Sequence, residues 1–370
     1  MKRIVKKLLF ILNILFALAL IASYISAFVS PEKFWYLAFF GLFYPFLLII
    51  NILFVIFWLL FRKFYFLLSL LCILGGLPFI TRIVQINNPF HDKYYYQQKY
   101  HPGNTSFKLL TFNVRLFNLY KWEAGNDAEA GIFSFIEREE PDIICFQEFY
   151  TRDSSKISEQ QVRNALKKCK NSHIYYSLNK KKTSHFGIAT FSVFPIVGSG
   201  EIKFPNTFNL CIYTDLQIGN DTIRVYNNHL QSIKFLKEDY GLLDTLKLKY
   251  NEKQIIGVQR IVIRLRDAFK TRSKQVNDVT SHIQKSPHPV IVCGDFNDSP
   301  VSYSYQTMRH HLKDAFIESG NGIGYTYRGK FPSYRIDFIL YDPILRSYEY
   351  QSPKLELSDH LPVICRFILP

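Results

Sequence analysis

From Leu8 to Val84 the chain is almost entirely apolar, and no other feature constrains its fold as strongly. This stretch contains three apolar runs, Leu8 to Val29, Phe34 to Phe61 and Tyr65 to Val84. Each run has at least the roughly 20 residues that an α-helix needs to cross the hydrocarbon core of a bilayer. The sequence therefore predicts about three transmembrane helices in residues 1–86.

Two other interpretations of this region stay open. The first run follows a basic start, as a cleaved signal peptide does, but it is long and lacks a convincing small-x-small cleavage site. The third run is weaker, because it contains Gly75, Gly76, Pro78 and Arg82. It could lie at the membrane surface instead of crossing the bilayer.

The cations beside these runs predict the orientation. Four Lys or Arg residues precede the first run, and Arg62 and Lys63 separate the second run from the third. In the loop after the first run, Lys33 stands beside Glu32. Because cytoplasmic loops are enriched in Lys and Arg, we expect the N-terminus in the cytoplasm. Three crossings would make this an integral membrane protein of the inner or plasma membrane with its large domain outside the cytoplasm.

The net charge of +15 divides almost evenly, with +7 in residues 1–86 and +8 in residues 87–370. The second value suits an anionic substrate or an anionic membrane surface equally well, so it does not select nucleic acid. Four of the six cysteines lie within apolar, strand-like runs, where a buried thiol is ordinary. Neither a disulfide framework nor the spacing of a zinc site is visible.

Residues 87–106, rich in Tyr, Gln and Lys, are expected to form a linker, and residues 107–370 one large domain. The expected strands are Lys108 to Val114, Ile143 to Gln147, Phe186 to Val193, Leu210 to Ile218, Thr222 to Asn228, Val290 to Cys293, Arg335 to Tyr341 and Val363 to Leu369. The expected helices are Asp127 to Glu139, Ile157 to Cys169, Val258 to Gln284 and Tyr303 to Leu312. Many short strands with few helices favour two stacked sheets with helices outside.

Polar side chains gather at the ends of these apolar strands. They are Asn113, Gln147, Glu148, Asn228, His229, Asp295, Asn297, Asp337, Asp359 and His360. Singly, each has an ordinary explanation, such as a turn or a solvated strand end. Together, six polar insertions at six strand ends predict a shared cleft. Its carboxylates, amides and imidazoles are the groups that a hard cation and a phosphate require.

Seven motifs follow one another between Leu109 and Phe367: T-F-N-V, Q-E, G-I-A-T-F-S-x-x-P-I, N-x-H-L, G-D-F-N-D, R-I-D-F-I-L and S-D-H-L-P-V. This ordered set closely resembles the endonuclease/exonuclease/phosphatase superfamily, which includes deoxyribonuclease I-like nucleases, abasic-site endonucleases, neutral sphingomyelinases and inositol-phosphate phosphatases. No core motif is missing. The resemblance implies an α/β fold, a two-sheet β-sandwich flanked by helices, as in deoxyribonuclease I.

The resemblance also implies one divalent cation, Mg²⁺ or Mn²⁺, held chiefly by Glu148, with Asn113 and Asp359 nearby. The catalytic residues that it implies are His229, Asp295, Asn297, Asp337 and His360. Asp295 would position or deprotonate the attacking water, and Asn297 and His229 would contact the phosphate. His360, oriented by Asp337, would stabilise or protonate the developing charge, although the two histidines could exchange roles.

The expected function is therefore hydrolysis of a phosphodiester or phosphomonoester by a membrane-anchored, metal-dependent enzyme. Membrane anchoring favours a phospholipid headgroup or another envelope phosphoester as the substrate. A nuclease acting on DNA or RNA is the main alternative, and a catalytically inactive, membrane-bound binding module is a third. The bilayer is the expected partner, and no obligate protein partner is evident.

Two further segments have alternative interpretations. Arg272 and Gln275 lie one turn apart on the long helix before G-D-F-N-D, and they could face either the cleft or solvent. The segment from Ser232 to Gln259 mixes lysines with Phe, Leu and Tyr, which is typical of an amphipathic surface. It could rest on a headgroup layer and shape substrate access, or pack on the flank of its own domain.

Overall fold

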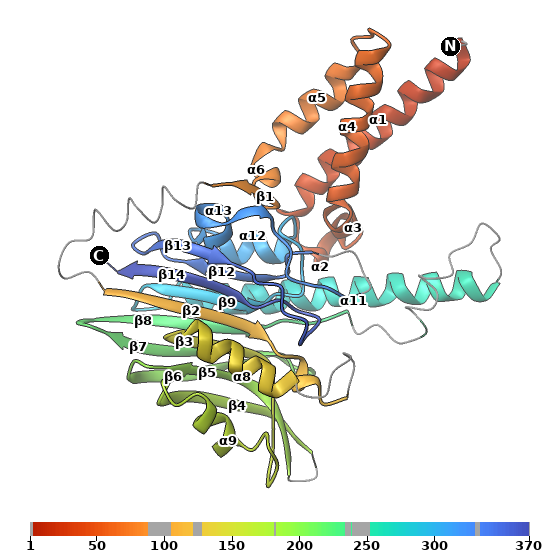
Figure 1. Cartoon of the computed structure of the whole chain (residues 1–370). Coiled ribbons are helices and arrows are strands. Elements are labelled where there is room, and N and C mark those ends of the chain that lie inside the picture. Colours follow the sequence, from red (N-terminus) through yellow and green to blue (C-terminus); the bar gives the residue numbers. More distant parts are fainter. Residues whose placement is uncertain are drawn as a thin grey trace. The chain divides into compact units, whose positions relative to one another are not determined.

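The computed structural model describes residues 3–87, 105–120, 128–180, 183–233, 238, 252–329 and 334–369. Its elements form two compact units, each assembled from segments that are distant in the sequence (Figure 1). Unit 1 comprises Met1–Ile83, Ile233–Val276 and Asp298–Thr307, and unit 2 comprises Val84–Ser232, Asn277–Asn297 and Met308–Pro370. The apolar N-terminal region therefore shares a unit with two segments from far along the chain.

Unit 2 is built on two six-stranded sheets. The first has the order β10 (Lys313–Asp314), β12 (Asp337–Tyr341), β9 (Val290–Asp295), β8 (Asp221–His229), β7 (Leu210–Ile218) and β6 (Ile196–Lys203). The second has the order β13 (Arg346–Gln351), β14 (Val363–Leu369), β2 (Thr105–Asn113), β3 (Ile143–Arg152), β5 (Ser184–Ser192) and β4 (Asn171–Lys180). Strands β2 and β3 are parallel, as are β8 and β9, and the other neighbours are antiparallel. A separate antiparallel pair joins β1 (Val84–Ile86) to β11 (Asn321–Ile323).

The hydrophobic core of unit 2 lies between the two sheets. Alternate residues of each strand point inward, so Leu109 and Cys145 of one sheet share a buried cluster with Val225 and Cys293 of the other. The intervening residues pack under α8 (Ala128–Glu139) and α9 (Glu159–Ala165), which form a second cluster outside β2 and β3. These layers confirm an α/β fold with two mixed sheets and helices. The thiols of the strand cysteines are buried, as expected.

Several boundaries differ from the sequence expectation. Strands β4, β6 and β13 were not expected, because β4 and β13 are polar and only partly buried, and β6 is an edge strand with two glycines. Helix α11 runs from Glu252 to Ile283 and begins six residues before the expected Val258. The remaining short helices are η1 (Arg115–Asn118), α12 (Tyr303–Arg309) and α13 (Ala315–Ser319). Most of Ser232 to Gln259 lies outside the described residues.

Unit 1 contains the N-terminal helices α1 (Arg3–Ser26), α2 (Pro31–Phe34), α3 (Leu37–Leu42), α4 (Tyr44–Leu60), α5 (Phe66–Gly75) and α6 (Leu77–Ile80). Of the described residues, only α1 forms a helix long and apolar enough to cross a membrane. The expectation of three such helices is therefore wrong. Pro45 lies in the first turn of α4, which has 17 residues, and Gly76 with Pro78 follows the end of α5, which has 10 residues. A proline cannot continue a preceding helix without losing a hydrogen bond and clashing with a carbonyl one turn earlier.

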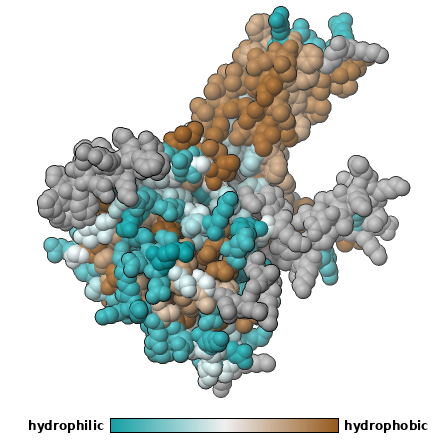
Figure 2. Space-filling view, viewed as in Figure 1, coloured by the Kyte–Doolittle hydropathy of each residue, from teal (hydrophilic) through white to brown (hydrophobic). Residues whose placement is uncertain are grey.

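The N-terminal helices of unit 1 bury several polar side chains and expose many large apolar ones. Asn13 and Ser69 are fully buried, and the Asn13 amide donates to the Ser69 hydroxyl at 2.6 Å. The Ser69 hydroxyl in turn donates to Asn51, and the Trp58 indole donates to Asn13. Large apolar side chains of α1, α4 and α5 are exposed, and Figure 2 shows this hydrophobic surface. Such an exposed apolar surface is unusual for a protein region surrounded by water.

A buried ion pair holds the start of α13 in unit 2. The Arg335 guanidinium donates to both carboxylate oxygens of Asp314, at 3.0 and 2.8 Å, and both side chains are at most 1% exposed. The guanidinium also lies 4.6 Å from the ring centres of both Phe316 and Phe338. Asp314 additionally caps α13 by accepting from the Phe316 N–H. Asp314 therefore depends on Arg335 for charge compensation.

We expect Arg335→Met to lower the free energy of unfolding of the full-length protein by about 3–5 kcal/mol, because it leaves the Asp314 carboxylate buried without its partner. Chemical denaturation followed by circular dichroism measures this change. Arg346→Met is the matched control, since Arg346 is exposed and its replacement should change stability by no more than about 0.5 kcal/mol. Equal stability of the two variants would contradict the prediction.

Candidate active site

The strand register of unit 2 brings the predicted residues to one edge. Asn113 pairs with Gln147 at the ends of the parallel strands β2 and β3. His229 pairs with Asp295 at the ends of the parallel strands β8 and β9, and Asp337 faces Asp295 across the antiparallel pair β12–β9. Polar side chains from both sheets therefore converge at the same edge of the sandwich.

The carboxylate of Asp295 is the centre of this cluster, and the residue is 1% exposed. It accepts hydrogen bonds from the Asn113 amide at 3.0 Å, from the Asn297 backbone at 2.8 Å and from the Asn297 amide at 3.0 Å. Burial raises the pKa of Asp295 to about 6, although the nearby charge of His360 opposes the shift. Asp295 is thus ionised at neutral pH and has a pKa suited to accepting a proton.

Backbone conformation places this carboxylate. Gly294 has φ +118°, and a Cβ at this position would collide with the backbone of Asn228 on the neighbouring strand. Asn297 has φ +53°, a left-handed conformation that Asn adopts more readily than most residues. The G-D-F-N sequence therefore meets two local steric requirements on either side of Asp295.

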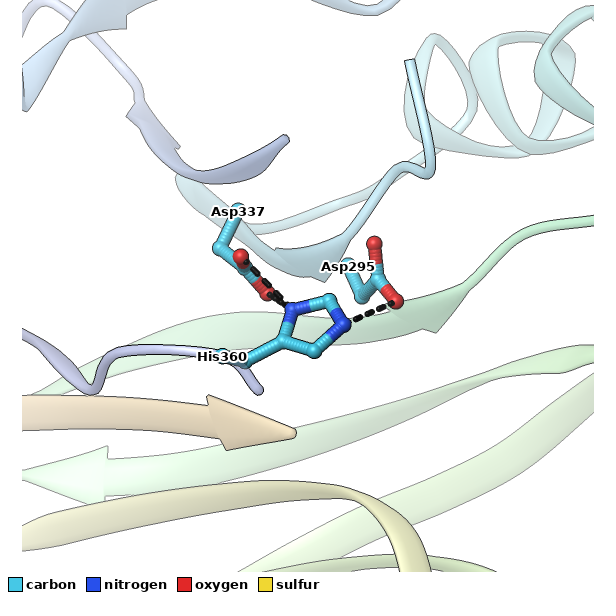
Figure 3. Close-up of side chains that lie close together, drawn as sticks. All are labelled: Asp295, Asp337 and His360. Atoms are coloured by element: carbon cyan, nitrogen blue, oxygen red, sulfur yellow. Dashed lines mark hydrogen bonds and ion pairs between the residues drawn. The ribbon is translucent and has the colours of Figure 1, made fainter. Parts of the chain in front are cut away.

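His360 and Asp337 form a second part of the cluster (Figure 3). The His360 Nδ1 lies 3.0 and 3.2 Å from the two carboxylate oxygens of Asp337, and its Nε2 lies 3.8 Å from Asp295. Burial lowers the pKa of His360, but the charges of Asp337 and Asp295 outweigh it and raise the pKa to about 10. The imidazole is therefore protonated at neutral pH, with Nε2–H directed toward Asp295.

Thr326 joins the two chain segments that carry this pair. Its hydroxyl oxygen accepts the backbone N–H groups of Ile336 and Asp337, each at 3.0 Å. Its carbonyl oxygen accepts the N–H of Leu361, next to His360, at 2.6 Å. The sequence analysis did not identify Thr326, because it belongs to none of the seven motifs.

Glu148 reaches the cluster because β3 is irregular. The pairing of β3 with β5 shifts between Phe146 and Phe149, and Glu148 adopts φ +48° at this bulge. A bulge inserts an extra residue and redirects the side chain beside it. The Glu148 carboxylate consequently lies 3.7 Å from the Nε2 of His229. Burial raises the pKa of Glu148, with the charge of His360 opposing the shift.

The Nε2 atom of His229 is buried and has no hydrogen-bond partner. It lies 3.8 Å from the Asp295 carboxylate as well as 3.7 Å from Glu148. Burial lowers the pKa of His229, although the charge of Asp295 opposes the shift. A neutral imidazole with an unsatisfied nitrogen among carboxylates is placed to bind another polar group, such as a phosphate oxygen or a water molecule.

Asn113 and Asp359 lie in the cluster with partners of their own. Asn113 directs its amide NH₂ toward Asp295 and Glu148, and its oxygen accepts the Arg115 N–H at 3.0 Å. The Asp359 carboxylate lies 3.2 Å from the Arg115 guanidinium. Sequence reasoning missed Arg115, although it directly follows T-F-N-V.

Two groups of residues here could hold a divalent cation. Asp295, Asp337 and His360 have ligand-type atoms within 4.8 Å of one another. Their atoms, however, already satisfy each other, because Asp337 binds the imidazole and Asp295 accepts three hydrogen bonds. The other group centres on Glu148, whose carboxylate faces the unsatisfied nitrogen of His229. A hard cation prefers oxygen ligands such as the Glu148 carboxylate. The residues around Glu148 therefore fit a Mg²⁺ or Mn²⁺ ion.

Not every expectation about these residues agrees with the geometry. Asn297 donates its amide to Asp295 and to the Leu230 carbonyl, so its NH₂ group positions Asp295 rather than pointing to open space. Arg272 and Gln275 are 1% and 2% exposed, and Arg272 pairs with Asp298 within unit 1. Their burial contradicts the expectation of an exposed helix face.

Comparisons with known proteins agree with this architecture. The model of the endonuclease/exonuclease/phosphatase family matches residues 110–360, more than half of the chain, and residues 6–83 match a domain of unknown function, DUF8431. The solved structure of an endonuclease/exonuclease/phosphatase from Beutenbergia cavernae is similar, with 16% identity, a TM-score of 0.52, and coverage of 71% of this chain and 72% of that one. The structure of ANGEL2, described as a 2′,3′-cyclic phosphatase, has 15% identity, a TM-score of 0.50, and coverage of 73% and 97%. No curated protein matches the sequence.

This protein therefore has the two-sheet fold of these similar structures, with a buried carboxylate–imidazole cluster at one edge of the sheets. It belongs to the endonuclease/exonuclease/phosphatase family.

We expect Asp337→Asn to lower kcat by about 10²–10⁴-fold, because an amide no longer fixes the tautomer and charge of His360. Steady-state kinetics on a soluble phosphodiester measures the loss. His360→Ala should be at least as damaging, and the double variant should be no worse than the poorer single variant, since the two residues act as a unit. Additive losses would contradict the pairing.

Proposed function

We propose that this protein is a metal-dependent hydrolase of phosphoester bonds. The observation that carries the proposal is the buried Asp295 carboxylate, placed 3.8 Å from the imidazole of His360, which itself lies 3.0 Å from Asp337. A base and an acid held side by side can remove a proton from water and supply one to a leaving group. Asp337, His229 and Glu148 complete the set of catalytic and metal-binding groups.

In the proposed step, a water oxygen attacks phosphorus and the ester P–O bond breaks. Asp295 accepts the proton of the water, and the His360 imidazolium gives a proton to the leaving oxygen. Asp337 keeps His360 oriented and favours its charged form. His229 Nε2 contacts a phosphoryl oxygen, and Asn297 and Asn113 hold the Asp295 carboxylate in place.

Glu148 would hold the cation, with Asp359 and Asn113 at its margin. A bound Mg²⁺ or Mn²⁺ ion polarises the phosphoryl oxygen and offsets its developing negative charge. Asn113 would ligate the ion only after its amide turned to present the oxygen that now accepts from Arg115. Asp359 would likewise exchange the Arg115 guanidinium for the ion. Glu148 is therefore the residue on which binding of the ion depends most.

We expect Glu148→Gln to abolish turnover of bis-p-nitrophenyl phosphate by the full-length protein while leaving its circular dichroism spectrum unchanged. EDTA should abolish wild-type turnover, and added Mg²⁺ or Mn²⁺ should restore it. Glu137→Gln is the matched control, because Glu137 is exposed on α8. Near-wild-type activity of Glu148→Gln at low millimolar Mg²⁺ would overturn the metal assignment.

We further propose that the N-terminal helices anchor the enzyme in a membrane. The support is their inverted polarity, with buried Asn13, Asn51 and Ser69 and with exposed apolar side chains on α1, α4 and α5. The basic N-terminus and the Arg62–Lys63 loop favour a cytoplasmic N-terminus. A single crossing by α1 would then place the catalytic domain outside the cytoplasm.

We expect the full-length protein to stay with the membrane fraction after an alkaline carbonate wash. A reporter that is active only outside the cytoplasm should be active when fused after Pro370. A cytoplasmic reporter at the same position is the control and should be inactive. The opposite pattern would place the catalytic domain in the cytoplasm and favour an intracellular substrate.

A membrane anchor favours a phospholipid headgroup or another envelope phosphoester as the substrate. A nuclease is the alternative, and the structural similarity to ANGEL2, described as a 2′,3′-cyclic phosphatase, makes 2′,3′-cyclic phosphates a reasonable class to test. A panel of sphingomyelin, phosphoinositides, single- and double-stranded DNA, and RNA would separate these substrates. Inactivity on all of them and on bis-p-nitrophenyl phosphate would favour a binding module instead.

A further inference from the structure

The segment Asp298–Thr307 directly follows the catalytic G-D-F-N motif, yet it belongs to unit 1 together with the N-terminal helices. Asp298 is bonded to Asn297, whose backbone and side chain both hold the Asp295 carboxylate. Contacts that hold this segment therefore also restrain the C-terminal end of the catalytic turn, because the two are joined by a peptide bond.

Arg82, just after α6, binds this segment. The residue is 5% exposed, and its guanidinium donates to the Pro300 carbonyl at 3.1 Å and to the Gln306 side chain at 2.8 Å. The same guanidinium lies 4.4 Å from the ring centre of Phe79 and 5.2 Å from that of Tyr305. Hydrogen bonds of a buried charged group are among the stronger ones in proteins, so the contact fixes the segment at both ends.

Val301, in the same segment, packs among the N-terminal helices. It is 1% exposed and belongs to one buried cluster with Leu20 of α1 and Tyr44 of α4. The Ser26 hydroxyl approaches the Val301 carbonyl at 3.4 Å. A Cβ built on Gly41 would lie 2.7 Å from the same carbonyl oxygen, so a side chain at this position would displace the segment. Val301 is therefore a buried part of the cluster that the N-terminal helices form.

Asp298 is fixed from the other side by α11. The Arg272 guanidinium lies 3.1 Å from the Asp298 carboxylate, and both side chains are at most 8% exposed. The Ser304 hydroxyl donates to the same oxygen at 2.7 Å, and the Ser299 N–H donates to the other at 3.0 Å. A buried carboxylate with three donors is held rigidly, because each lost donor would leave it unsatisfied.

We infer that the N-terminal helical region positions the catalytic turn, with Arg82 as its principal positioning residue. This assigns a role to the region that matches a domain of unknown function, beyond anchoring the chain. The activity part of the inference rests on the proposed hydrolase function. Its structural part, immobilisation of residues 295–301 by Arg82, can be measured without any substrate.

The test uses full-length protein with Arg82→Gln and Arg82→Lys, and Arg62→Gln serves as the matched control because Arg62 is exposed. Arg82→Gln should lower kcat on bis-p-nitrophenyl phosphate by about 10–100-fold, since small misplacements of catalytic groups have effects of this size. KM should stay within about twofold, because the substitution does not alter His229, the proposed phosphate contact. Arg82→Lys should recover part of kcat, and Arg62→Gln should match the wild type.

Hydrogen–deuterium exchange provides the second readout. Arg82→Gln should speed amide exchange in residues 295–301 and leave exchange in β2 and β3 as in the wild type. If Arg82→Gln does not fold, Gly41→Ala should give the same pattern by displacing Val301. Unchanged exchange at residues 295–301 would overturn the inference, as would equal acceleration throughout unit 2. If Arg82→Gln speeds local exchange but the wild-type protein shows no turnover, the proposed hydrolase function is wrong and the structural part of the inference stands.

Discussion

Burial of the Asp295 carboxylate is the constraint on which the rest of the site depends. An ionised carboxylate with 1% exposure must be compensated by donors and positive charge. The compensating groups are Asn113 at the end of β2, Asn297 in the turn after β9 and His360 just before β14. Each must reach the same point, so the strand registers and the G-D-F-N turn are fixed together. The same compensation leaves the carboxylate ionised at neutral pH.

A second polar layer below the site joins the two sheets. The Gln147 amide of β3 donates to Asn227 of β8 at 2.6 Å, and the Asn227 amide donates to the Ala189 carbonyl at 3.0 Å. Both side chains are fully buried, so their hydrogen bonds form in an environment where an unmade bond is costly. They fix the spacing of β3 against β8, and with it the distance of 3.7 Å between Glu148 and His229.

The sequence predicted the fold class and most of the strands, because alternating apolar residues and strand-end polar residues are local signals. It could also place Asp295, Asp337 and His360 at one edge, since the first two lie at ends of short buried strands and the third lies just before another. The bulge at Glu148 was not predictable, because it arises from the pairing of β3 with β5. The apolar N-terminal runs indicated hydrophobic helices but not their breaks. The sequence left Arg272 facing either the cleft or solvent, because only the tertiary structure supplies Asp298 as its buried partner.

The contact between Ser26 and Val301 joins residues 275 positions apart in the sequence. At the usual rates of synthesis, the second residue leaves the ribosome about 15–55 s after the first. The N-terminal helices are therefore made long before the residue that completes their buried cluster. During this interval Val301 cannot contribute to the cluster, so the helices reach their final packing only after it has been synthesised. Biogenesis of this protein is thus expected to have a late step, in which the segment Asp298–Thr307 packs against N-terminal helices that were synthesised much earlier.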